Sequence, residues 1–125
     1  MRSNSNVTRS RGLRPITVRA TPAEGWHAVV SRSHLDPDTK RWIEQHRIAK
    51  LCNAGSSLKF CTIAEGEADV YPRLGPTMEW DTAAGHAVLL AAGGRVTDLD
   101  GQPMRYGKPQ FRNGNFVAWG KADGP

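Results

Sequence analysis

Short apolar segments typical of strands alternate with helical patterns along most of this chain, and this alternation most restricts its fold. Ala28-Val29-Val30 is a continuous apolar run, as in strands that are buried on both faces. Asp36-Pro37 then supplies a helix cap followed by proline in the first turn. Strands alternating with helices predict an α/β fold with a mixed, largely parallel sheet and flanking helices.

The expected strands cover residues 16–19, 26–31, 51–53, 68–71, 95–99 and 115–120. The expected helices cover residues 36–50, 55–66 and 78–92. In the last helix, small and apolar residues at helical spacing predict the stripe that packs on the sheet. This stripe comprises Trp80, Ala83, Ala84, Ala87, Val88 and Ala91, with Trp80 as its large anchor.

Composition is that of an ordinary globular domain, with 38% hydrophobic and 23% charged residues in 125. No apolar run approaches the roughly 18 residues that span a bilayer. The two cysteines, Cys52 and Cys61, are too few for a disulfide framework and share no metal-ligand spacing with the histidines. We therefore expect a soluble, cytoplasmic protein without stable membrane insertion.

The net charge of +5 comes from the amino-terminal end. Residues 1–20 contain five arginines and no acidic residue, which leaves 12 basic and 12 acidic residues elsewhere. Residues 1–14 have too few apolar side chains to fold alone, so we expect a disordered basic leader before a domain at residues 15–125. Contact with nucleic acid and an organelle transit peptide are alternatives for this leader. Without interleaved aromatic residues, we expect no nucleic-acid partner.

The segment Glu79 to His86 is the sharpest candidate for chemistry. Asp81 lies in the first turn of the last expected helix, where an aspartate commonly caps the helix or interacts with its dipole. Packing of Trp80 and the small residues after Asp81 would also hold the carboxylate rigidly, as a ligand of a hard cation requires. The residues alone leave both interpretations open.

The string W-D-x-A-A-G at residues 80–85 resembles the second signature of the inositol monophosphatase superfamily. The strings at residues 31–34, 55–61 and 68–77 resemble its 3'(2'),5'-bisphosphate nucleotidase branch, and the resemblance extends over residues 15–120. It implies that Asp81 binds Mg²⁺ beside the phosphate being hydrolysed. It also implies that the nucleotide and its non-reacting phosphate contact His34, Ser56, Ser57, Lys59 and Arg73.

The same resemblance implies that this chain is the carboxyl-terminal part of an αβαβα phosphatase sandwich. The family's first signature, which carries further metal ligands, has no match, since Asp36-Pro37-Asp38-Thr39 has the wrong spacing and lacks the glycine. One carboxylate cannot build a multi-metal site, so we expect the chain alone to be inactive. A missing amino-terminal half or a second copy is the expected macromolecular partner. Without it, we expect apolar strands at residues 28–30 and 117–119 to be exposed.

The activity implied for the complete protein is Mg²⁺-dependent hydrolysis of the 3'-phosphate of adenosine 3',5'-bisphosphate, as in nucleotide recycling during sulfate assimilation. The nucleophile implied is metal-activated water, without a covalent intermediate. One alternative is a phosphatase acting on inositol monophosphate or a sugar bisphosphate. Another is a non-enzymatic fragment or a nucleic-acid binder that uses the basic leader.

Overall fold

The computed structural model describes residues 16–31, 36–54, 58–75 and 77–121. Its elements, in chain order, are β1 (Trp26–Val30), α1 (Pro37–Gln45), β2 (Ile48–Asn53), α2 (Lys59–Ala64), β3 (Val70–Arg73), β4 (Thr77–Met78), α3 (Glu79–Ala91), β5 (Arg95–Thr97), the 3-10 helix η3 (Pro109–Phe111), β6 (Arg112–Asn113) and β7 (Phe116–Trp119). Strands and helices alternate over most of this order, as the sequence predicts.

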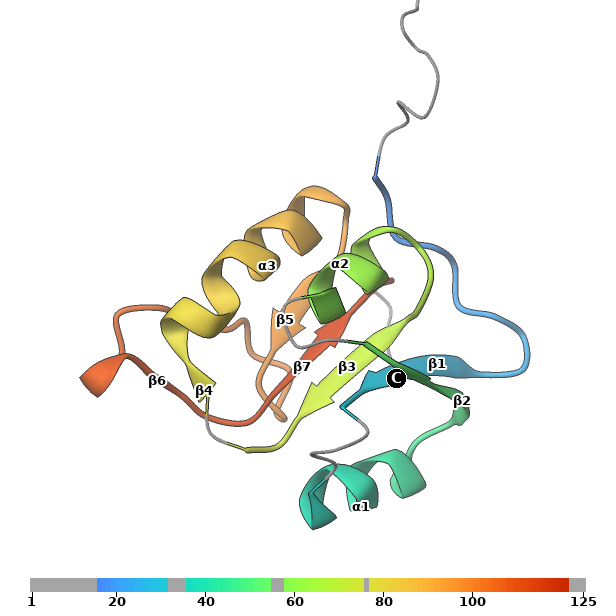
Figure 1. The fold of residues 1–125 in the computed structure, drawn as a ribbon, viewed down its shortest axis with the longest axis horizontal. Helices are drawn as coiled ribbons and strands as arrows, with labels where there is room; N and C mark the ends of the chain where they lie inside the picture. The colour runs from blue at the N-terminus through green and yellow to red at the C-terminus, as the bar shows by residue number, and fades with distance from the viewer. Residues whose placement is uncertain (1–15, 32–35, 55–57, 76, 122–125) are drawn as a thin grey trace, which may run out of the picture.

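Five strands form one sheet in the order β2-β1-β3-β7-β5 (Figure 1). β1 pairs in parallel with β2 and β3, whereas β7 runs antiparallel to both of its neighbours, β3 and β5. Four of the five strands therefore share one direction, and the predicted mixed, largely parallel sheet is confirmed. β4 and β6 form a separate two-stranded ribbon where α3 begins.

Helices cover both faces of the sheet, α2 and α3 on one and α1 on the other (Figure 1). Successive strand residues point to opposite faces. The face under α2 and α3 buries a cluster that includes Val29, Phe60, Ile63, Tyr71, Leu89, Phe116 and Ala118. The face under α1 buries Ala28, Trp42, Val70, Val117 and Trp119. The apolar strand residues on both faces of the sheet are thus buried under helices.

The predicted cap of α1 is present, and a glycine ends α3. Asp36 caps α1, where its Oδ1 accepts a hydrogen bond from Thr39 N at 2.7 Å. Gly93 follows α3 with a φ of 99°, a left-handed conformation that glycine adopts without strain. Gly85 allows α3 to approach α2, since a Cβ there would lie 2.6 Å from the Phe60 ring. A small residue therefore mediates helix–helix contact rather than contact with the sheet.

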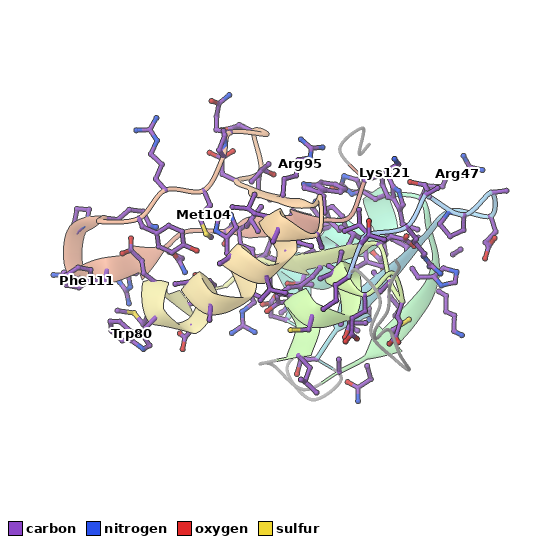
Figure 2. All side chains as sticks on the ribbon, turned by 90° about the horizontal axis from the view of Figure 1, so that it is seen from above. Arg47, Trp80, Arg95, Met104, Phe111 and Lys121 are labelled. Atoms are coloured by element: carbon purple, nitrogen blue, oxygen red, sulfur yellow. The ribbon has the colours of Figure 1, made fainter. Side chains whose placement is uncertain are left out.

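The predicted packing face of α3 is wrong. Trp80 is 67% exposed and points away from the body at the amino-terminal end of the helix (Figure 2). Val88 is 39% exposed, and the four alanines of the predicted stripe are exposed as well. The inward face instead carries Glu79, Thr82, His86 and Leu89. The first three are polar because they meet the polar segment at residues 104–113, not the sheet.

The expected exposure of residues 28–30 and 117–119 is also wrong, because both strands are buried between the helical layers. Exposed apolar side chains do include Trp80, Val88 and Leu90 on the outward side of α3. The predicted strand at residues 16–19 is absent from the described chain, where Val18 N donates a hydrogen bond to Ala92 O at the end of α3. No helix among the described residues is long and apolar enough to cross a membrane.

The buried carboxylate of Asp69 holds the segment before β1 in place. Its two oxygens accept from Arg19 Nε at 2.9 Å and Arg19 Nη2 at 2.8 Å, which raises the pKa of Arg19. Asp69 Oδ2 also accepts from His27 N, and the Asp69 carbonyl accepts from Gly120 N. One residue at the start of β3 thus links the amino-terminal segment with β1 and the end of β7.

We expect Asp69→Asn to lower the free energy of unfolding by about 1–3 kcal/mol, since it leaves a partly buried guanidinium without its charged partner. Asp38→Asn is the matched control, because the Asp38–Arg41 pair is exposed and worth at most about 1 kcal/mol. Urea denaturation of both variants measures the difference. Equal, small losses would show that the Asp69 pair contributes little.

Candidate functional site

The candidate site lies where two parallel strands end. β1 ends at Val30 and β3 at Arg73, and both carboxyl ends meet at one edge of the sheet. In open α/β sheets, ligands bind outside the carboxyl ends of strands. A small pocket opens at this edge, lined by Val30, Ser31, Asp36, Thr39, Lys59, Tyr71, Pro72 and Arg73.

Lys59 is the buried cation of this pocket. It is only 1% exposed, and its Nζ lies 5.5 Å from the centroid of the Tyr71 ring. Burial, together with the nearby positive charge of Arg73, lowers the pKa of Lys59. A buried charge is costly unless a partner of opposite sign accompanies it. The environment of Lys59 therefore favours an anionic ligand.

Arg73 supplies a second cation at the same edge. Its Nε is buried without a hydrogen-bond partner. Within the described residues, neither Arg73 nor Lys59 forms an ion pair with a carboxylate. Lys59 and Arg73 are neighbouring cations that form no ion pair within the described chain, although Asp36 also lines the pocket. Such a pair can bind a phosphate group, to which arginine presents a planar fork.

Tyr71 connects the two cations with α3. Burial raises the pKa of Tyr71, and the negative charge of Asp81 raises it further. The positive charge of Arg73 and a hydrogen bond from Arg73 act in the opposite direction. The Tyr71 ring packs edge-on against Phe60 and Phe116, which fixes the direction of its hydroxyl. Tyr71 is a site residue that the sequence motifs did not indicate. The available signal was a polar-tipped aromatic residue two positions before Arg73.

Asp81 lies on the first turn of α3, and its carboxylate is exposed. Its Oδ2 accepts a hydrogen bond from Met78 N at 2.8 Å, so the capping interpretation is correct. Its Oδ1 makes no hydrogen bond within the described part of the chain and is free to bind a cation. No group of three or more His, Cys, Asp or Glu side chains in the described residues could hold a metal ion. Asp81 fits one metal ligand but not a whole site.

Glu79 lies two residues before Asp81 and is buried. Hydrogen bonds from Lys108 and Gly107 lower the pKa of Glu79 to about 2. Its charge is thereby satisfied within the fold, unlike the cations of the pocket. Local sequence indicates no role for Glu79, since the residues that bind it lie 28 and 29 positions away.

The structure brings together part of the predicted site. Lys59 and Arg73 share one pocket, and Asp81 is close enough for its charge to act on Tyr71 between them. His34, Ser56 and Ser57 lie outside the described residues. Their roles stay predictions.

Residues 8–123 match the family model described as "Inositol monophosphatase family". This chain belongs to that family. Its enzymes are phosphatases that act on phosphoric monoesters and depend on a metal ion. The superfamily inferred from the W-D-x-A-A-G string is therefore confirmed.

Relatives narrow the family to one branch. The 3'(2'),5'-bisphosphate nucleotidase CysQ of Escherichia coli is 51% identical over 89 residues, which cover 70% of this chain and 36% of that protein. The crystal structure of CysQ from Bacteroides thetaiotaomicron is similar, with a TM-score of 0.72 and 46% identity, covering 82% of this chain and 40% of that one. An uncharacterized protein of Rhizobium leguminosarum is 58% identical over 63% of this chain and 90% of its own length. The chain thus spans well under half the length of the two CysQ proteins.

We expect Lys59→Met to stabilise the chain by about 1 kcal/mol in phosphate-free buffer, because replacing a buried charge with an apolar side chain is often stabilising. The same change should abolish the increase in thermal midpoint that inorganic phosphate, but not chloride at equal ionic strength, gives the unchanged chain. Lys50→Met, at an exposed position of β2, is the control and should alter neither quantity. A destabilised Lys59→Met that still responds to phosphate would show that Lys59 is structural.

Proposed function

We propose that this chain contributes the substrate-phosphate site and one metal ligand of a Mg²⁺-dependent 3'(2'),5'-bisphosphate nucleotidase. Its substrate would be adenosine 3',5'-bisphosphate, and the bond hydrolysed would be that of the 3'-phosphate. The observation that carries this proposal is the pair Lys59 and Arg73, two cations with no carboxylate partner in the described chain, near Asp81. Further support comes from the CysQ relatives.

Each residue has a separate task in this proposal. Arg73 and Lys59 neutralise and orient the phosphate that does not react, and the Tyr71 hydroxyl beside Arg73 can hydrogen-bond to the same group. Asp81 offers Oδ1 to the cation, while Oδ2 stays bonded to Met78 N. When bound, Mg²⁺ supplies a Lewis acid for the phosphoryl oxygens and lowers the pKa of water. The chain's own residues thus bind and orient the substrate.

The outward face of α3 supports a further part of this proposal. An apolar helix face is normally buried against another part of the protein. Here Trp80, Val88 and Leu90 are exposed on α3, and Asp81 lies beside them. We propose that the part of the family domain outside the match, in the same chain or another, covers this face and adds the remaining metal ligands.

Substrate choice separates this proposal from an inositol or sugar phosphatase. The test uses a complete domain in which this chain is joined to the unmatched part of Escherichia coli CysQ. We expect Arg73→Ala to raise KM for adenosine 3',5'-bisphosphate at least tenfold, since a charge-assisted contact is worth roughly 1.5–3 kcal/mol. KM for adenosine monophosphate, which lacks the non-reacting phosphate, should rise much less. The measurement is KM for both substrates, with Arg112→Ala as the exposed control. Equal losses for the two substrates would favour the alternative enzymes.

Asp81→Asn tests the metal ligand in the same complete domain. Asparagine keeps the size of the side chain and an oxygen that can accept the Met78 N–H, but it lacks the charge that magnesium prefers in a ligand. We expect the thermal midpoint to change little while phosphate release falls by roughly two or more orders of magnitude. Both quantities are measured on one preparation across a magnesium titration. Near-normal turnover would leave Asp81 as a helix cap alone.

A further inference from the structure

The first two turns of α3 are attached to a segment distant in sequence, residues 104–113, which we call the strap. The inward face of these turns consists of Glu79, Thr82 and His86, which are all buried. Buried polar groups without partners cost about 1–3 kcal/mol each. Partners for all three come from the strap, so this end of the helix is held by polar contacts and not by the sheet.

Glu79 makes the central contact. Its Oε1 accepts from Gly107 N at 3.0 Å, and its Oε2 accepts from Lys108 N at 2.9 Å. Lys108 Nζ forms an ion pair with the same Oε2, also at 2.9 Å. One buried carboxylate therefore binds two consecutive backbone N–H groups and a side-chain cation of the strap.

Two further strap residues hold the same turns. Tyr106 Oη lies 2.8 Å from His86 Nδ1 and 3.3 Å from Thr82 Oγ1. Asn113 Nδ2 donates to Met78 O at 3.1 Å and Thr82 Oγ1 at 3.2 Å. Met78 is thus held on its carbonyl side by the strap and on its N–H side by Asp81 Oδ2. The position of the Asp81 carboxylate depends on the same backbone that the strap fixes.

We propose that Glu79 is a positioning residue, which anchors the strap to the first turn of α3 and thereby fixes the Asp81 carboxylate. This inference deepens the proposed function and rests on it, since Asp81 is there the metal ligand. The Glu79 side chain is buried in the fold, whereas the Asp81 carboxylate is exposed. It acts through the Met78–Asp81 bond and touches neither substrate nor metal. Outer residues that orient a metal ligand commonly change metal affinity by about 10–100-fold.

The test compares Glu79→Gln with Glu67→Gln, an exposed glutamate in the segment that follows α2. In this chain, NMR follows the amide protons of Gly107 and Lys108, which Glu79 binds, and of Met78, which Asp81 binds. We expect Glu79→Gln to speed hydrogen exchange at all three amides by about tenfold or more, while Val96 in the core is unchanged. In the complete domain, the magnesium concentration at half-maximal activity should rise about tenfold, with little change in KM for the nucleotide.

Lys108→Met is a milder second variant, because it removes the ion pair but keeps both backbone hydrogen bonds to Glu79. It should shift the same amides and the magnesium dependence in the same direction, by a smaller factor. Faster exchange at Gly107 and Lys108 with an unchanged Met78 and unchanged magnesium dependence would overturn the proposal. Faster exchange at Met78 together with an unchanged magnesium dependence of the complete domain would support the positioning of Asp81. It would overturn the role of Asp81 as a metal ligand.

Discussion

The arrangement of the sheet depends on the contacts of the Asp69 carboxylate. It lies directly before the central strand β3 and binds the Arg19 guanidinium and the His27 amide, while its carbonyl receives the Gly120 amide. The charge of the arginine at this end of β3 is satisfied. Arg73, at the other end of the same strand, has no carboxylate partner in the described chain. The strand thus separates a closed structural ion pair from an open cationic pocket.

The pocket differs from the rest of the fold in its electrostatic cost. Lys59 and Arg73 repel each other, and burial adds to the cost of the Lys59 charge. A chain under selection for stability alone would place an apolar residue or a carboxylate there. The unfavourable pair is reasonable where a phosphate supplies the missing negative charge, as in the nucleotidase proposed above.

Much of the fold could be predicted from local sequence because the signals were local. The apolar run at residues 28–30, the Asp36 cap and the glycines after α3 each determine their own neighbourhood. The orientation of α3 could not be predicted in this way. The apolar stripe headed by Trp80 lies on the exposed side, so hydrophobic periodicity indicated the wrong inward face. The partners that bury Glu79, Thr82 and His86 lie 20 to 31 residues further along the chain. The same limit applies to the site, where motifs indicated Lys59, Arg73 and Asp81 but only the packing of the Tyr71 ring reveals its place among them.

The contact between Gly85 and Phe60 has a consequence for the chemistry at both ends of the helix pair. Phe60 follows Lys59 on α2, and Gly85 lies one turn after Asp81 on α3. At this point the Phe60 side chain packs directly against the backbone of α3, so the two helices lie close together. In the proposed site, the separation between a phosphate at Lys59 and a cation at Asp81 would then depend on an apolar contact that touches neither ligand. A single methyl group at Gly85 would alter that spacing.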